Sequence, residues 1–126
     1  MMVEHRSSSG GETAVDLLIV THNSARYVRR CVESIRRHLP GCRVHIVDNA
    51  STDGTRRILP SLGPDSLKLN DENCCLSPVW NELLREAPGE FVVLANPDLV
   101  VNDGAFLYRS VEAMRSDPAV VACGCL

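Results

Sequence analysis

Polar side chains follow three apolar segments of this 126-residue chain, at the point where each segment ends. The candidates for binding a ligand or a metal ion are, in chain order, Thr21, His22, Asn23, Asp48, Asn49, Asn96 and Asp98. Each apolar segment is typical of a buried strand, and parallel strands end at one edge of a sheet, where ligands bind. Hydroxyl and amide groups can hydrogen-bond a base or a ribose, and a carboxylate can help hold Mg²⁺. The sequence therefore predicts a polar crevice along this edge.

The segment over residues 44–55, VHIVDNASTDGT, places Asp48 where a strand ends and Asp53 in the loop that follows. Asp48 either contacts the ligand or caps this loop. Asp53 precedes a glycine, and Asp-Gly is a common turn pair whatever the function. Asp98 either binds a cation or caps the turn after Pro97. The sequence leaves both the ligand-binding and the structural interpretation of each aspartate open.

Two phosphate-binding motifs are absent from the sequence. The first strand is followed by THNSAR, without GxGxxG, and there is no GxxxxGK[ST] loop. Six cysteines are present, but Cys74 and Cys75 are adjacent, and Cys123 and Cys125 are separated by one residue. Neither spacing is typical of a zinc knuckle, so we expect reduced, mostly buried thiols.

The apolar pattern predicts strands over residues 15–21, 43–48, 66–69, 91–95 and 119–123. It predicts helices over 25–38, 55–59, 77–87 and from a cap at 102–103 to 117. In the third helix, Ser77 is expected to be the N-terminal cap and Pro78 the first helical residue. Trp80 lies on the apolar face of this helix and is expected in the core, not as a platform for a ligand. Strand and helix alternate, so we expect an α/β fold with three α/β/α layers and a mostly parallel sheet. Residues 1–13 read as a flexible tail before a domain over 14–126.

Composition and charge narrow the class of partner. The net charge of −3 and the pI of about 5.8 give no general attraction to nucleic acid. Five arginines lie within the helix predicted over 25–38, and they form either a solvated face or a surface for acidic lipid or a partner chain. No apolar run reaches the roughly 18 residues of a membrane span, and no signal peptide is apparent. We expect a cytoplasmic protein.

Three motifs together resemble a known family. The stretches IVTHNSARYVRRCVESI, VHIVDNASTDGT and EFVVLANPDLVV, in this order, are similar to the N-terminal nucleotide-sugar-binding half of a family 2 glycosyltransferase with the GT-A fold. The resemblance covers residues 15–126. It implies inverting transfer of a sugar from a UDP- or dTDP-linked donor to a hydroxyl of a saccharide or lipid-linked acceptor, with Mg²⁺ or Mn²⁺, in cell-wall or polysaccharide biosynthesis.

The resemblance also implies residue roles. Thr21, His22 and Asn23 would line the nucleotide pocket, Asp48 would hydrogen-bond the base beside Asn49, and Asp53 would support the loop or face the nucleotide. These roles follow from the family motifs alone. Asn96 stands where the family has the first aspartate of its Asp-x-Asp motif, as in a rhamnosyltransferase-like branch. Asp98 is then the expected metal ligand.

The chain departs from the family in two respects. Where members have Asn-x-Gly-Phe, this chain has Asn73-Cys74-Cys75-Leu76, and Cys75 adds a side chain where glycine lets the backbone approach the donor. Members also continue into an acceptor half that supplies the general base, and we assign no catalytic residue. A truncated or split half that binds nucleotide or a partner chain without turnover is therefore an alternative. A receiver-like signalling module needs an acidic cluster after the first strand, which is missing.

Overall fold

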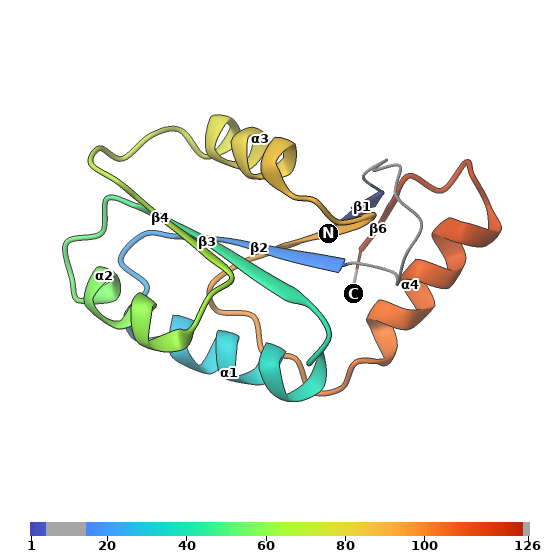
Figure 1. The fold of residues 1–126 in the computed structure, drawn as a ribbon, viewed down its shortest axis with the longest axis horizontal. Coiled ribbons are helices and arrows are strands. Elements are labelled where there is room, and N and C mark those ends of the chain that lie inside the picture. The colour runs from blue at the N-terminus through green and yellow to red at the C-terminus, as the bar shows by residue number, and fades with distance from the viewer. Residues whose placement is uncertain (5–14, 125–126) are drawn as a thin grey trace.

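The computed structural model describes residues 1–4 and 15–124 and shows one twisted sheet with helices on both faces (Figure 1). Its elements are β1 (Met2–Glu4), β2 (Val15–Thr21), α1 (Val28–His38), β3 (Arg43–Asn49), α2 (Thr55–Ile58), the 3₁₀ helix η1 (Leu59–Leu62), β4 (Ser66–Asn70), α3 (Leu76–Glu86), β5 (Phe91–Ala95), α4 (Ala105–Ser116) and β6 (Ala122–Cys123). The expected α/β class with three layers is confirmed.

The sheet has the strand order β4-β3-β2-β5-β1-β6. The four strands β4, β3, β2 and β5 are parallel, whereas β1 runs antiparallel to both β5 and β6. β2 therefore lies at the centre, between β3 and β5. Its burial on both faces explains why its sequence, VDLLIVT, is almost continuously apolar.

β1 corrects one prediction. Residues 1–13 were expected to form a flexible tail, but Met2–Glu4 pair with β5 along one side and with β6 along the other. A segment of three residues has no periodic pattern of its own, so pairing with β5 and β6 makes these residues a strand. The rest of the predicted tail, residues 5–13, lies outside the described residues.

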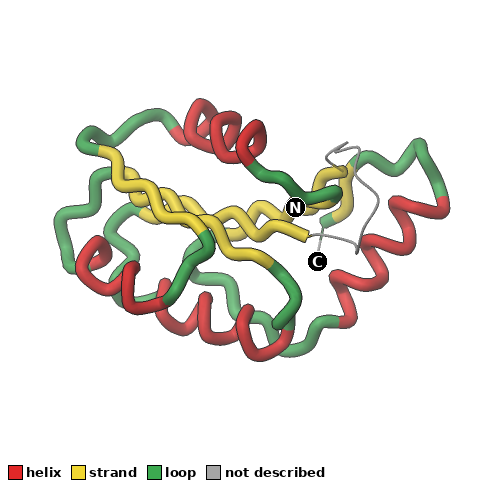
Figure 2. The backbone as a smooth tube through the Cα atoms, in the orientation of Figure 1, coloured by secondary structure: helices red, strands yellow, loops and turns green. Residues whose placement is uncertain are grey.

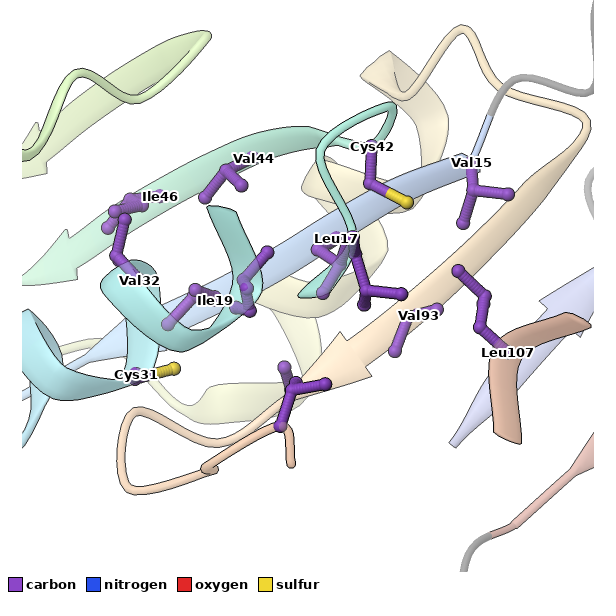
Figure 3. Packing of buried hydrophobic residues seen from close by; sticks show 14 of the residues in the cluster. Val15, Leu17, Ile19, Cys31, Val32, Cys42, Val44, Ile46, Val93 and Leu107 are labelled. Carbon is purple, nitrogen blue, oxygen red and sulfur yellow. The ribbon is translucent and has the colours of Figure 1, made fainter. Parts of the chain in front are cut away.

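The larger core lies on the face covered by α1, α2, η1 and α4. Leu17 and Ile19 point to this face from β2, and Val28 and Ile35 meet them from α1; all four are fully buried. Figure 3 shows the side chains of this cluster, which include Leu107 of α4. Each fully buried aliphatic side chain contributes roughly 1.5–3 kcal/mol, so this face fixes α1 beneath the strands that carry the polar crevice.

The opposite face is covered by α3 alone among the described helices (Figures 1 and 2). Val79 and Leu83 of α3 pack on Leu18 and Val20, the side chains of β2 that point to this face. Trp80 packs against this cluster, as expected of a residue on the apolar face of its helix, and is half-buried.

Several boundaries differ from prediction. α3 begins at Leu76, with Cys75 as its cap, so the prediction that Ser77 caps the helix and Pro78 opens it is wrong. α1 begins at Val28 instead of residue 25, after a turn whose carbonyl at Ser24 accepts two backbone hydrogen bonds. β6 is two residues long, shorter than the expected 119–123, because it pairs only with the short β1.

A buried carboxylate joins the amino-terminal ends of three strands. Asp16 of β2 is fully buried and accepts hydrogen bonds from Arg43 Nε at 2.5 Å and from Gly89 N at 2.6 Å. Burial alone would raise the pKa of Asp16, but hydrogen bonds from His45, Arg43 and Gly89 outweigh it and lower the pKa to about 2. The anion therefore ties the start of β2 to β3 and to the turn before β5.

Candidate functional site

The carboxyl ends of the central strands converge, as the sequence predicts. Thr21 pairs with Asp48 across β2 and β3, and Asn49 pairs with Asn70 across β3 and β4. β5 lies on the other side of β2, and its last residue, Ala95, pairs with Ile19. The loops that carry the candidate polar residues therefore leave the sheet at the same edge (Figure 2).

Asp48 is fully buried and fully engaged within the protein. Its Oδ1 accepts hydrogen bonds from Thr21 Oγ1 at 2.9 Å and from Ser51 Oγ at 2.5 Å. Its Oδ2 accepts from Ser51 N at 3.0 Å and lies 3.4 Å from Arg56 Nε. A buried carboxylate needs such partners. Asp48 can therefore hydrogen-bond the base of a nucleotide only if the ligand replaces one of these internal hydrogen-bond partners.

Asn23 holds the loop after β3 from the side of β2. Its Oδ1 accepts hydrogen bonds from the backbone N of Thr52 at 2.8 Å and of Asp53 at 3.3 Å. Its own backbone N donates to Ser51 Oγ at 2.9 Å. The two loops predicted to line the crevice are thus joined through one exposed amide side chain.

Asp53 supports the same loop. Its Oδ1 accepts from the backbone N of Gly54 and from both the backbone N and the hydroxyl of Thr55, and its Oδ2 accepts from Ala25 N at 3.1 Å. These hydrogen bonds, that of the Thr55 hydroxyl first, lower the pKa of Asp53. Of the two roles considered for Asp53, loop support is the one this geometry describes.

His22 is exposed at the crevice. Its Nδ1 lies 2.8 Å from the carbonyl oxygen of Asn49, so Nδ1 carries a proton and donates it. Its Nε2 lies 3.4 Å from the Asn23 side-chain amide nitrogen, which is consistent with Nε2 as the acceptor. The ring is therefore oriented by β3 and is exposed at the crevice.

Asn49 holds the segment between β4 and α3 at the side of the crevice. Its Nδ2 donates to Asn73 Oδ1 and to the Cys74 carbonyl, both at 2.8 Å, and its Oδ1 accepts from Cys74 N at 3.0 Å. Cys74 and Cys75 are exposed free thiols, contrary to the expectation of mostly buried cysteines. The hydrogen bonds of the Asn49 side chain therefore go to the segment of Asn73 and Cys74, and the two thiols are exposed at the surface of that segment.

Two strained residues lie in these loops. Asn23 has φ of 50° and Ala50 has φ of 58°, and no other non-glycine residue in the described ranges has a positive φ. Asparagine adopts this left-handed conformation fairly readily, but alanine does so at a cost of about 1–2 kcal/mol. Such strain clusters at functional sites, where the surrounding structure maintains it. Ala50 lies between Asn49 and Ser51, so its backbone conformation determines how the chain turns from one to the other.

The segment after β5 borders a cleft of about 800 Å³. Asp98 is exposed and lines this cleft together with Asn96, and Trp80 of α3 and Phe106 of α4 also line it. The Asn96 carbonyl oxygen accepts hydrogen bonds from Leu99 N at 3.1 Å and from Cys31 Sγ at 3.7 Å. The loop that presents Asp98 is thereby tied to α1.

The buried thiol of Cys31 serves as a neutral donor. Burial, with a smaller effect of the Asp98 charge, raises its pKa to about 12. Burial likewise raises the pKa of Cys42 to about 11. Both thiols stay protonated at physiological pH, as expected for cysteines that act as small apolar residues.

The side chains at this edge are suited to a divalent cation whose other ligands come from a bound diphosphate. Among residues 1–4 and 15–124, no three His, Cys, Asp or Glu side chains form a metal-binding cluster. Asp98 offers one exposed carboxylate, and Mg²⁺ is typically bound by one or two carboxylates together with phosphate oxygens and water. Asp98 is therefore a suitable ligand for a metal bound to a diphosphate.

Sequence reasoning missed Ser51 and Arg56, which contact Asp48, and Thr55, whose hydroxyl accepts from Ser24 N at 2.7 Å. Ser51 could have been found, because an aspartate commonly accepts a hydrogen bond from a backbone N–H a few residues later in a loop. No local signal marks Arg56, since its contact depends on how α2 packs against β3.

The sequence is similar to that of a known family. The family model described as Glycosyl transferase family 2 matches residues 16–126. EpsH of Bacillus subtilis (strain 168) is 29% identical over 93 residues, which are 68% of this chain and 26% of EpsH.

Solved structures show the same fold. The mannosyltransferase PcManGT from Pyrobaculum calidifontis, in complex with GDP-Man and Mn²⁺, superposes with a TM-score of 0.70 at 28% identity, over 82% of this chain and 32% of that one. S. aureus TarS (1–349) gives a TM-score of 0.69 at 22% identity, over 82% and 32%. The chain thus spans about a third of these proteins and about a quarter of EpsH. The α/β architecture is GT-A-like.

Proposed function

Because this chain belongs to glycosyl transferase family 2, we propose that it binds a nucleoside-diphosphate sugar and a divalent cation at the carboxyl edge of its sheet. The observation that carries the proposal is the convergence of three loops there, two joined by Asn23 and a third presenting Asp98. The relative PcManGT was solved with GDP-Man and Mn²⁺, which supports this class of donor and metal. UDP- and dTDP-sugars are the other donors to test.

The nucleotide would lie against the loops after β2 and β3. His22 and Asn23 are exposed there and face the ligand in this proposal. Thr21, Asp48 and Asp53 act behind them, because their side chains hold the two loops together. Asp48 is therefore a positioning residue in this proposal. It would contact the nucleotide base directly only if the base replaced one of its internal hydrogen-bond partners.

Asp98 would bind the metal ion at the diphosphate. A cation there supplies stabilisation of the negative charge on the departing diphosphate. Asn96 replaces the first aspartate of the family motif, which leaves a single carboxylate and supports assignment to a rhamnosyltransferase-like branch. The backbone of Asn96 holds the loop through Leu99 and Cys31.

The cleft beside Asp98 would receive the sugar. Its volume of about 800 Å³ falls within the usual range of small-molecule sites, roughly 300–1,000 Å³. Trp80 offers an apolar ring face and Asp98 and Asn96 offer hydrogen-bond acceptors, the combination that a sugar ring requires. We further propose inverting transfer to a hydroxyl of a saccharide or lipid-linked acceptor, for which no described residue is assigned as general base.

Calorimetric titration with UDP-, dTDP- and GDP-sugars in the presence of Mn²⁺ tests this proposal. Asp98→Asn should weaken binding about 10- to 100-fold, the effect of losing a charged contact. Glu112→Gln is the matched control, because Glu112 is exposed on α4 and outside the cleft lining. No measurable binding of any donor at millimolar concentration, or equal binding by both variants, would overturn it. Release of the nucleoside diphosphate, measured separately, distinguishes turnover from binding alone.

A further inference from the structure

The outer surface of α1 and the turn before it carries four exposed arginines, here termed the arginine face. They are Arg26, Arg29, Arg30 and Arg37. The opposite side of α1 is apolar and buried against the sheet. The donor crevice is proposed at the loops where the strands end. Arg29, Arg30 and Arg37 lie on α1, outside that crevice, and Arg26 lies in the turn between the crevice and α1.

Helical geometry makes this surface a single stripe. Arg30 and Arg37 are seven residues apart, which is about two turns, so they lie above one another. Val28 and Ile35 are also seven apart and are fully buried on the opposite side. Arg30 and Arg37 therefore point directly away from the sheet, and α1 lies along the underside of the protein (Figure 1).

The charges of the arginine face are largely uncompensated. Arg36, at the side of α1, is paired with Asp65 at 2.9 Å and is not part of this surface. Arg29 reaches Glu33 at 3.9 Å, a solvent-exposed contact of small energy. Arg30 and Arg37 have no ion pair in the part of the chain that the structure describes.

The charge distribution of the chain is strongly asymmetric. The four arginines of the face and Glu33 together carry a formal charge of +3, whereas the whole chain carries −3. The remaining residues therefore carry a net charge of −6. An anionic surface attracts the arginine face and repels the net negative charge of the remaining residues.

We propose that the arginine face binds the anionic phosphate groups of a phospholipid surface. All basic side chains of the face are arginines, whose planar guanidinium groups pair with phosphate in bidentate fashion. Tyr27, at one end of the face, is 49% exposed, and aromatic rings of this kind favour the membrane–water interface. The face lacks the apolar cluster that a protein partner would bury and the row of aromatics that single-stranded nucleic acid would need.

Vesicle co-sedimentation tests this inference. We expect binding to phosphatidylcholine vesicles that contain about one-third phosphatidylglycerol and not to phosphatidylcholine alone, with loss of binding as salt rises from about 0.05 to 0.5 M. The double variant Arg30→Glu/Arg37→Glu should bind at least tenfold more weakly, since each basic residue near an anionic surface contributes about a fivefold gain. Arg30→Gln/Arg37→Gln should show a smaller loss in the same direction.

The matched control is Arg85→Glu/Arg109→Glu, which makes the same charge change at exposed sites on α3 and α4 and should keep binding within about twofold. Equal losses in the two charge-reversal variants, or equal binding to neutral vesicles, would overturn the proposal. So would tighter binding to single-stranded RNA than to the vesicles. Donor titrations of the same variants should match the parent protein, so this test is independent of the proposed function.

Discussion

Thr21 and Asp48 lie directly opposite each other in β2 and β3, and Thr21 Oγ1 donates a 2.9 Å hydrogen bond to Asp48 Oδ1. Both residues are fully buried. The strand pairing that builds the sheet therefore also fixes the carboxylate around which the loop after β3 folds. Changes at this pair should affect the stability of the protein and the shape of the crevice together.

Thr21→Val should lower the free energy of unfolding by about 1–3 kcal/mol, because it keeps the side-chain shape but leaves a buried carboxylate with one donor fewer. Urea denaturation measures the change. Thr52→Val is the control, since Thr52 is exposed and its hydroxyl lies 3.4 Å from its nearest partner; we expect less than about 0.5 kcal/mol there. Similar losses in the two variants would contradict the role given to Thr21.

Ala50→Gly should stabilise the protein, by up to about 1 kcal/mol, because glycine adopts a φ of 58° without the steric cost that alanine bears. Thermal unfolding followed by circular dichroism measures this shift. Ala113→Gly, in the exposed interior of α4, should have the opposite sign, with a loss of about 1 kcal/mol. Destabilisation by Ala50→Gly would show that Ala50 is not strained.

Acid should destabilise the protein partly through Asp16. Its pKa is about 2 in the folded protein against 3.8 as the ordinary value, so its contribution is present above about pH 4 and is lost as the pH falls from about 4 toward 2. The contribution is of the order of 2 kcal/mol. Asp16→Asn should remove that part of the pH dependence in urea denaturation at several pH values.

Asp65→Asn is the comparison for this acid effect. The backbone N of Val44 and the guanidinium of Arg36 lower the pKa of Asp65. Because Asp65 is exposed, its contribution to the loss of stability in acid should be smaller than that of Asp16. An unchanged pH dependence in Asp16→Asn would show that the buried cluster does not govern acid stability.

The fluorescence of Trp80 should report the sugar of the donor. Trp80 is the single tryptophan of the chain, and it lines the cleft with Asp98. A sugar nucleotide with Mn²⁺ should change its emission more than the nucleoside diphosphate alone. Trp80→Phe should keep most of the affinity and Trp80→Leu should lose about 2- to 10-fold, the value of an aromatic ring contact. Equal emission changes with and without the sugar would contradict this placement.

Periodic elements were predictable because burial imposes its pattern locally. Strands β2 and β5 lie at the predicted residues, since each is buried on both faces and bounded by polar turns. The short β1 was not predictable, because pairing with β5 and β6 creates it. The start of α3 was misplaced at Ser77 because sequence preference favoured a serine cap with proline next, whereas the backbone of Cys74 is held by Asn49 and starts the helix earlier.

The convergence of the polar residues was predictable, and their roles were not. Strand order and direction bring Thr21, Asp48 and Asn96 to one edge, and topology alone fixes that. Whether a carboxylate faces solvent or the protein depends on side chains from other elements. Asp48, near the end of β3, is enclosed by Ser51 and Arg56, whereas Asp98, three residues beyond the end of β5, is exposed.

The sheet also has an open side, because β4 is its outermost strand and pairs only with β3 among the described strands. An unpaired strand of this kind can recruit the same strand of a second molecule and begin aggregation. Lys68 stands in the middle of β4 and forms an ion pair with Glu82 of α3. A charged side chain held in the middle of an edge strand is one of the features by which natural proteins resist pairing along such a strand.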